Sequence, residues 1–293
     1  MHKSAFLIHA LSPLHAGTGH SSDLVDLPTA RMKGTQIPYV PGSSIKGVLR
    51  HERLEAAGID DRAKADALTV FGPETANAGD HAGAIIVGDA RLLALPVRSF
   101  TGTFAWVTSP LLLRLAARDL DWRLPLPSLP PRGARVTSTS CCLHEKVLYL
   151  EDLDLPAQAD DKTVKPWAEK LAPHIYPDAH DLFRDRLAVV DDETMSFLME
   201  TATQIDARVR LKAETRTVAD GALWLEESLP SETLLVGLLV ADKGRNPKHP
   251  LTAEAVLRLA LGAEATLQLG GKASVGRGRC RVIPLSTPAK ASA

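Results

Sequence analysis

Several residues near the start of the chain have side chains that could do chemistry. Residues 14–50 place His15, Asp23 and Asp26 in a polar stretch punctuated by glycine and proline, with little core-forming character. A carboxylate in such a loop can hold a divalent cation, and a histidine can orient or protonate a reacting group. Most loop carboxylates are only solvated, however, and a lone histidine is more often structural. The residue types alone permit this chemistry without selecting it.

Two further segments carry groups that could bind an anion. The stretch "PGSSIK" predicts a helix start, whose free N–H groups, together with the Ser43 and Ser44 hydroxyls and Lys46, would point at an anion. The stretch "LGGKASVGRGR" supplies Lys272 and Arg277 on a loop whose glycines let a phosphate chain come close. Most helix N-termini bind nothing, and the glycine-rich stretch could equally be a simple hairpin turn.

Charge is distributed unevenly along the chain, although the net charge is only −1. Residues 1–50 carry five Lys or Arg against two Asp, and residues 268–281 carry four Lys or Arg and no acid. Residues 151–193 carry twelve acids against five bases. Basic segments from the two ends could converge on one phosphate-tracking face, or these charges could simply solvate several faces.

Composition is that of an ordinary globular protein, with 45% apolar and 24% charged residues over 293 positions. The first residues give neither a signal peptide nor a membrane span. Three cysteines, two of them adjacent (Cys141 and Cys142), make neither a disulfide framework nor a CxxC zinc site. We therefore expect a cytoplasmic protein with reduced thiols and no membrane partner. No P-loop, GxGxxG, HExxH or nucleophile-elbow motif is present.

Hydrophobic periodicity and turn residues predict alternating strands and helices. Ser43 or Ser44 could cap the first helix, Gly58 would end it, and Ser109 with Pro110 marks a second helix start. The acidic stretch from 154 to about 185 predicts loops and short helices. The expected strands are 5–11, 82–97 (one bent strand or a pair), 146–153, 203–213, 222–228, 233–241 and two flanking the glycine-rich loop. The expected helices lie within 41–58, 108–120 and about 251–262. This β-α-β order with long insertions predicts an α+β fold of ferredoxin type, not a doubly wound nucleotide fold.

Four segments in order carry a resemblance to a known family. They are "LSPLHAGTG…DLP…R…PYVPGSSIKGVLR", "FGP…AGAIIVGDARLLALPVRSFTGTFAWVTSP", "AETRTVADGALWLEESLPSETL" and "LQLGGKASVGRG". Together they resemble the repeat-associated (RAMP) proteins of CRISPR systems, and more closely the backbone subunit of type III-B, or Cmr, effector complexes. The resemblance covers most of the chain apart from a variable middle at about 120–200.

The resemblance implies a ferredoxin-like palm of RNA-recognition type, with inserted fingers and a thumb β-hairpin. It implies a single RAMP domain over residues 1–285, and the last eight residues, 286–293, have the composition of a flexible tail. Within that domain the expected parts are a first loop at about 12–41, an insertion at about 120–200, the thumb at about 203–228 and a glycine-rich loop at 269–278.

The resemblance also implies partners and an activity. Such subunits stack as a helical filament on a CRISPR guide RNA, together with other Cmr subunits. The thumb interrupts the guide–target duplex at a regular spacing, and the complementary target RNA is cut beside each interruption with a divalent metal ion, Mg²⁺ or Mn²⁺.

Asp26 matches the family's catalytic position, which makes it the predicted catalytic and metal-binding residue. RNA supplies its own nucleophile, the 2′-hydroxyl, so an aligned carboxylate and its cation are enough. Asp23 lies outside the matching position and is interpreted as solvated. His15 and the pair Glu226 and Glu227 are the further candidates for the cut site. Relatives often have a tyrosine beside that pair, but here the neighbours are Leu225 and Ser228, which puts a phenol contribution in doubt.

The basic features would then bind the guide backbone by shape and phosphate contacts, with sequence left to base pairing. An aromatic content of 4% fits this reading better than base stacking. The predicted guide-binding residues are Gly42, Ser43, Ser44, Lys46 and Arg50 at the helix start, and Gly271, Lys272 and Arg277 in the glycine-rich loop.

Two alternatives belong to other functional classes. One is a structural filament subunit that does not cleave RNA. The other is a metal-independent RAMP endonuclease that processes the guide precursor with a histidine as general acid. Loss of cleavage in EDTA would exclude the second.

Overall fold

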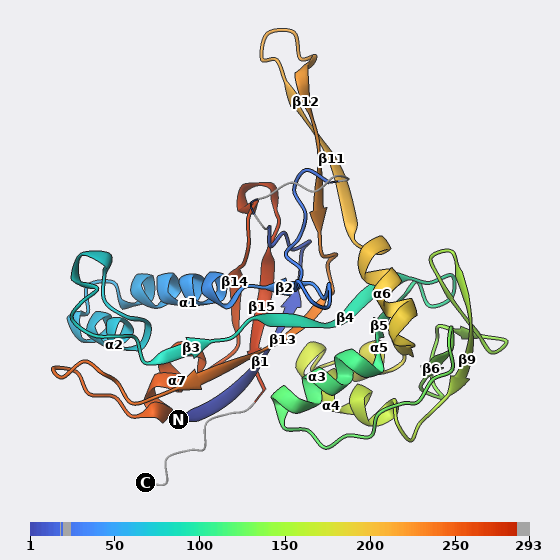
Figure 1. Ribbon diagram of the computed structural model, residues 1–293, viewed down its shortest axis with the longest axis horizontal. Helices are drawn as coiled ribbons and strands as arrows, with labels where there is room; N and C mark the ends of the chain where they lie inside the picture. The colour runs from blue at the N-terminus through green and yellow to red at the C-terminus, as the bar shows by residue number, and fades with distance from the viewer. Residues whose placement is uncertain (18, 20–24, 286–293) are drawn as a thin grey trace.

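The computed structural model describes residues 1–17, 19 and 25–285 (Figure 1). The predicted tail at 286–293 and Asp23 lie outside the described residues. The strands are β1 (His2–Ala10), β2 (Tyr39–Val40), β3 (Ile85–Val87), β4 (Ala90–Arg98), β5 (Phe104–Thr108), β6 (Ala134–Val136), β7 (Leu143–His144), β8 (Val147–Leu150), β9 (Leu153–Ala159), β10 (Leu187–Val190), β11 (Gln204–Leu211), β12 (Val218–Ser228), β13 (Leu234–Ala241), β14 (Ala265–Gln268) and β15 (Arg279–Pro284). The helices are α1 (Gly42–Ala57), α2 (Asp61–Phe71), α3 (Pro110–Leu120), α4 (Lys165–Ile175), α5 (His180–Arg184), α6 (Asp192–Thr201) and α7 (Ala253–Leu261), with 3₁₀ turns η1 (Thr75–Asn77) and η2 (Ala273–Val275).

One large mixed sheet runs through the body of the molecule. Its strand order is β14-β15-β1-β13-β4-β5-β10-β6-β9-β8-β7, with β2 added beside β4 and β3 beside β13. The β5–β10 and β6–β9 pairs are parallel, whereas the other paired strands are antiparallel. The predicted α+β class is therefore confirmed. The segment 82–97, expected to form one bent strand or a pair, forms β3 and β4, which pair one after the other with β13 and not with each other, so they resemble one interrupted strand.

The central strands are buried on both faces. Phe6 and Ile8 of β1 point into a core shared with α1, α2 and α7, while Leu7 between them points into a second core with α3, α4 and α5. In Figure 1 the first group of helices lies in the left half of the molecule and the second in the right half. This alternation follows from the two-residue period of a strand, and it explains the continuous apolar run in β1.

The insertion at about 120–200 is more regular than its composition predicts. It extends the large sheet with β6 to β10 and adds helices α4 to α6. Its helices α4 and α5 pack into a core that contains Trp106, Trp167 and Phe183, each fully buried. The stretch 154–185, expected to hold loops and short helices, contains most of β9 as well as α4 and α5.

The start of α1 differs from the prediction. Pro41, with φ −58° and ψ 134°, is the N-cap, and no side chain caps the helix from that position. The Gly42 N–H instead donates to Asp89 Oδ1 at 2.8 Å. Ser43 and Ser44 are exposed within the first turn. The capping role assigned to the serines is therefore wrong, because the helix begins before them and a distant carboxylate takes the N-terminal N–H.

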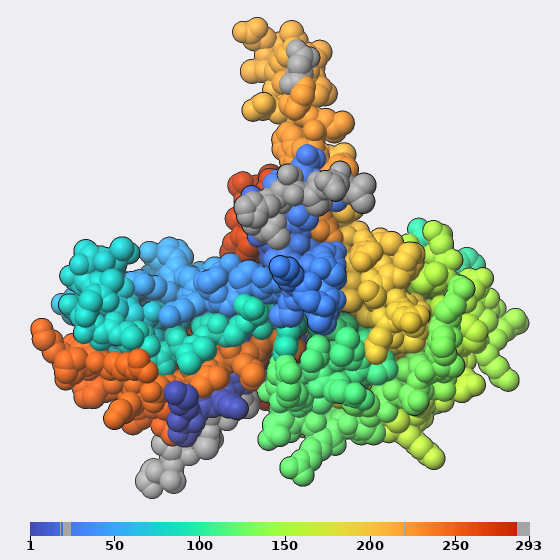
Figure 2. All heavy atoms as spheres, viewed as in Figure 1, coloured from blue at the N-terminus to red at the C-terminus, as the bar shows by residue number. Residues whose placement is uncertain are grey.

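The predicted hairpin at 203–228 is present and stands away from the body as a column (Figures 1 and 2). Its strands pair Ile205 with Glu227, Ala207 with Leu225 and Val209 with Leu223, and a bulge follows before the turn. Side chains of directly paired residues share a face. One face of the hairpin therefore carries the exposed apolar residues Ile205, Val209, Leu211, Val218 and Leu223.

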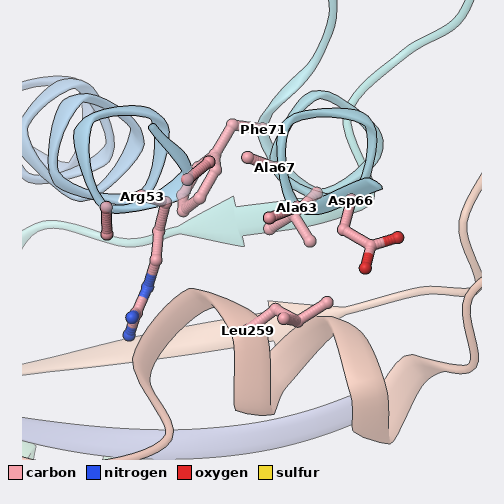
Figure 3. A pocket seen from close by; sticks show the side chains of 9 residues that line it. Arg53, Ala63, Asp66, Ala67, Phe71 and Leu259 are labelled. Carbon is pink, nitrogen blue, oxygen red and sulfur yellow. The ribbon is translucent and has the colours of Figure 1, made fainter. Parts of the chain in front are cut away.

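A mainly apolar cavity of about 210 Å³ lies between α1, α2 and α7 (Figure 3). Ala63, Ala67 and Phe71 of α2 form one wall, and Leu259 of α7 closes the base. None of the predicted site residues lines it. Among the described residues, no helix has both the length and the apolar character needed to cross a membrane.

Candidate functional site

Asp26 lies at the base of the projecting hairpin. Its Oδ2 accepts a hydrogen bond from the Leu225 N–H at 2.8 Å. The next residues run beside β12 like an added parallel strand: the Leu27 N–H donates to the Leu225 carbonyl at 3.1 Å, and the Glu227 N–H donates to the Leu27 carbonyl at 2.9 Å. The Asp26 side chain is nevertheless exposed. The first loop thus presents an accessible carboxylate at a fixed place on the hairpin.

Glu227 clamps the following part of this loop. Its carboxylate is buried and accepts from the Thr29 N–H at 2.8 Å and from the Arg31 guanidinium at 2.6 Å. Arg31 also donates to the Met199 carbonyl at the end of α6, at 2.8 Å. The Glu227 side chain therefore fixes the register of the loop segment that carries Asp26.

Glu226 is buried too but faces another partner set, because neighbouring residues of a strand point to opposite faces. Its carboxylate binds Lys272 Nζ at 2.7 Å, Trp224 Nε1 at 2.7 Å and Arg208 Nε at 3.4 Å. The two glutamates of the predicted acidic pair therefore bind different parts of the protein. Glu227 holds the first loop, and Glu226 holds the glycine-rich loop.

Both carboxylates stay charged despite their burial. Burial alone would raise the pKa of Glu226, but the hydrogen bonds from Lys272 and Trp224 outweigh it and the pKa lies below its ordinary value. Burial would likewise raise the pKa of Glu227, but the Arg31 charge and the Thr29 N–H hold it below the ordinary value. Each glutamate is therefore a fixed anion bound to fixed donors.

His15 is buried beneath the same strand. Its Nδ1 lies 2.6 Å from the Glu227 carbonyl, which can only accept, so Nδ1 carries the hydrogen. The other ring nitrogen, Nε2, lies against Gly17, where a Cβ would stand only 2.7 Å away. The His15 carbonyl accepts from the Gly271 N–H at 3.0 Å. These contacts join the first loop, the hairpin and the glycine-rich loop, while a part for His15 in proton transfer stays a prediction.

The glycine-rich loop is anchored on both sides. Arg277 is buried and pairs with Asp206 of β11, and its Nη1 has no hydrogen-bond partner within the described part of the chain. The Gly278 N–H donates to the Pro13 carbonyl at 2.9 Å. Gly278 has φ +78°, and a Cβ there would meet the Leu269 carbonyl oxygen at 2.0 Å, so only glycine fits. Segments near the two ends of the chain therefore lie in contact, while Lys272 and Arg277 each pair with a carboxylate.

The predicted guide-binding residues at the start of α1 have mixed surroundings. Ser43 and Ser44 are exposed and Lys46 is half-buried. The Gly42 N–H is already taken by Asp89, and Arg50 donates to the Pro73 carbonyl at 3.1 Å. Ser43, Ser44 and Lys46 are thus the members of this set best placed to meet a ligand.

A divalent cation would find one protein carboxylate at Asp26. Over residues 1–17, 19 and 25–285, His, Cys, Asp and Glu side chains nowhere gather in threes in a way that could hold a metal. Mg²⁺ commonly binds through one or two carboxylates and keeps several waters or phosphate oxygens as its other ligands. The exposed Asp26 carboxylate is compatible with that mode of binding.

The partners of the predicted site residues carry no signal in the sequence. Arg31 lies within the first segment of resemblance, but no pattern there points to its pairing with Glu227. Asp89 is likewise too far along the chain from Gly42 to be recognised as its hydrogen-bond partner. Asp206 and Arg208 alternate along a strand, which would have placed them on one face, but nothing indicated their partners Arg277 and Glu226.

Comparisons with known proteins give consistent matches along the chain. The family model of the RAMP superfamily matches residues 7–281. The protein "CRISPR system Cmr endoribonuclease Cmr4" of Pyrococcus furiosus is 34% identical over 283 residues, which cover 94% of this chain and 93% of that protein. A crystal structure of oligomeric Cmr4 from Pyrococcus furiosus matches with a TM-score of 0.73 and 27% identity, over 97% of this chain and 99% of that one. A cryo-EM structure of the type III-B Cmr-beta complex bound to cognate target RNA shares the fold, with a TM-score of 0.71 and 20% identity over 97% of this chain and 98% of that one.

Proposed function

This chain belongs to the RAMP superfamily and, within it, to the Cmr4 family, and we propose that it is the guide-RNA-binding backbone subunit of a type III-B CRISPR effector that cleaves complementary target RNA. The relative named an endoribonuclease aligns over nearly the whole of both chains. The observation that carries the proposal is the position of Asp26, an exposed carboxylate held against the base of a projecting hairpin.

The centre of the sheet supports a ferredoxin-like palm. The neighbouring strands β15, β1, β13 and β4 are antiparallel, α1 follows β1, and α7 follows β13. This is the β-α-β-β-α-β order with both helices on one face. The hairpin β11–β12 and the insertion would then be the thumb and part of the fingers.

In the proposed reaction the RNA 2′-oxygen gives up its proton to solvent and attacks the adjacent phosphorus, while the P–O5′ bond breaks and the 5′-oxygen leaves and takes up a proton. RNA thus supplies the nucleophile, and the protein must align the reacting groups. Asp26 would hold Mg²⁺ or Mn²⁺, which when bound neutralises charge that develops on the phosphate. The Leu225 N–H fixes one carboxylate oxygen of Asp26, and the Glu227 clamp fixes the loop behind it. The chain thereby contributes a pre-positioned anion at the foot of the hairpin.

The hairpin is suited to interrupt a duplex. Ile205, Val209 and Leu223 on one of its faces are between 47% and 65% exposed. Apolar side chains that enter a nucleic-acid helix unstack neighbouring bases, at a cost of a few kcal/mol per step. A subunit that wedges the duplex here would place the strained phosphate near Asp26, and repeated copies would give regularly spaced cuts.

Guide binding is proposed for Lys46 and for the glycine-rich loop. Lys272 and Arg277 are paired with Glu226 and Asp206, so RNA phosphates would have to share or replace these carboxylates. The oligomeric state of the Pyrococcus furiosus relative supports assembly of several copies along one guide.

The metal-independent alternative needs an accessible histidine as general acid. His15 is buried, with Nδ1 bonded to a carbonyl and Nε2 against Gly17. This environment argues against His15 as that general acid.

The experiment that tests the proposal is cleavage of labelled complementary RNA by the complex reconstituted on a guide RNA. Regularly spaced products with Mg²⁺ or Mn²⁺, and none in EDTA, are the expected result. Cleavage that persists in EDTA would support the metal-independent enzyme. Guide and target binding without cleavage would support a purely structural subunit.

A further inference from the structure

The sulfur atoms of Cys141 and Cys142 both lie next to Gly102, in the turn between β4 and β5. A Cβ built on Gly102 would lie 2.9 Å from Cys141 Sγ and 2.9 Å from Cys142 Sγ. The two sulfurs therefore lie within twice that distance of each other. Gly102 has φ +73°, and any larger residue there would collide with both sulfurs.

The two thiols have different access to solvent. Cys141 is exposed and Cys142 is fully buried. Cys141 Sγ lies 3.4 Å from the Asp185 carbonyl, and Cys142 Sγ lies 3.3 Å from the Phe104 carbonyl. Each thiol hydrogen thus has a backbone acceptor, and both cysteines are reduced.

We propose that Cys141 and Cys142 form a redox-active vicinal dithiol, a modification site separate from RNA cleavage, which a small-molecule disulfide oxidises to a reversible disulfide. The Cys141 thiolate attacks one sulfur of the oxidant, forms a mixed disulfide and releases the first thiol. The Cys142 thiolate then attacks Cys141 Sγ and releases the second thiol. Two protein thiols are oxidised and one disulfide is reduced to two thiols, so electrons and protons balance.

The bond would be readily reversible. Adjacent Cα atoms are about 3.8 Å apart, closer than the usual range of about 4.4–6.8 Å in disulfides. The eight-membered ring is consequently strained, and strained disulfides are more easily reduced and belong to the labile or regulatory kind. Such a bond behaves as a switch rather than as a structural crosslink.

The order of attack follows from exposure. Cys141 meets the oxidant first because it is exposed. Burial, and then the neighbouring Cys141, raise the pKa of Cys142 to about 12, so ring closure should speed up as the pH rises. Oxidation also removes both thiol hydrogens, so the contacts to the Asp185 and Phe104 carbonyls are lost.

The test is treatment of the intact full-length protein with oxidised glutathione, followed by intact-mass measurement and peptide mapping under non-reducing conditions. The expected product has lost two hydrogens, maps to the peptide with Cys141 and Cys142, and reverts with dithiothreitol. Cys280, buried in β15, is the internal control, so Cys280→Ser should behave like the wild type.

Cys141→Ser and Cys142→Ser should each abolish the two-hydrogen loss, with folding checked by circular dichroism. Two wild-type outcomes would overturn the proposal without reference to any variant. One is a glutathione adduct that persists on Cys141 and never resolves, as expected of an ordinary surface thiol. The other is a protein whose two thiols remain unmodified.

Discussion

The Asp26 carboxylate accepts a hydrogen bond from the Leu225 N–H at 2.8 Å, which fastens the predicted catalytic residue to a strand of the projecting hairpin. The first loop is therefore hydrogen-bonded to the base of the hairpin at Asp26. A displacement of the hairpin base by its target would move Asp26 with it. The hairpin, which we propose distorts the RNA, therefore also holds in place the Asp26 carboxylate, which we propose takes part in cleavage.

Arg31 should be a positioning residue for Asp26. Arg31→Gln leaves the buried Glu227 carboxylate without its partner charge, so we expect the free energy of unfolding to fall by about 3 kcal/mol. Cleavage should fall as well, because the loop loses its register. Urea unfolding and cleavage rates measure the two effects. Arg31→Lys, which keeps the positive charge but not the guanidinium group, should lose less stability and less activity. An Arg31→Gln variant as stable as the wild type would show that the pairing of Arg31 with Glu227 does not hold the loop.

The two buried glutamates should make stability depend on acid pH. Their folded pKa values lie below the ordinary value of 4.5, so their stabilisation is complete above that pH and is lost as the pH falls through the folded values. Glu227→Gln removes one such contribution. The difference in melting temperature between wild type and this variant should therefore be largest near neutral pH and shrink below about pH 4.5. A melting-temperature difference that stays constant from about pH 7 to about pH 3 would contradict the lowered pKa of Glu227. Glu214→Gln, an exposed position in the hairpin turn, is the control.

The apolar face of the hairpin should be needed for regular cleavage and dispensable for folding. Leu223 is 65% exposed, so Leu223→Asp should change stability by no more than about 0.5 kcal/mol. The charged side chain would resist insertion between bases, so the regular ladder of products should blur or vanish. Leu223→Ile serves as the matched control and should keep the ladder. An unchanged ladder in the Asp variant would place the wedge elsewhere.

Lys46 should contribute to guide affinity through phosphate contact alone. Lys46→Ala should weaken binding similarly for guides of different sequence and lower the salt dependence by about one unit of slope. Binding titrations at several salt concentrations measure both quantities. Lys64→Ala, at a lysine of α2 with similar exposure, should leave them unchanged. A loss confined to certain guide sequences would argue against backbone recognition.

Local signals in the sequence predicted the elements that depend on local contacts. The Ser109 side chain caps α3 as expected, Pro110 occupies its first turn, and Gly58, with φ 54°, ends α1. The polar stretch between two β-rich segments predicted the hairpin because its pairing is also local. The prediction for Asp26 rests on the family resemblance, because periodicity does not distinguish it from other loop carboxylates.

Long-range contacts could not be predicted in this way. Arg31 and Glu227 are 196 positions apart, and Gly42 and Asp89 are 47 apart, so neither pattern nor propensity links them. The parallel pairing of β10 with β5 likewise joins segments separated by most of the insertion. Side-chain pairing across such distances depends on the folded arrangement of the whole sheet, which one sequence does not reveal.

The most direct measurement is a time course of target cleavage by complexes that carry Asp26→Asn. The amide keeps an oxygen that can accept from the Leu225 N–H but loses the negative charge, so the fold, assembly and target binding should survive. Cleavage with Mg²⁺ or Mn²⁺ should fall by about three orders of magnitude or more, whereas Asp23→Asn should cleave nearly as the wild type does. Wild-type cleavage by the Asp26→Asn complex would contradict the central claim, and a loss of target binding in it would make Asp26 a binding residue instead.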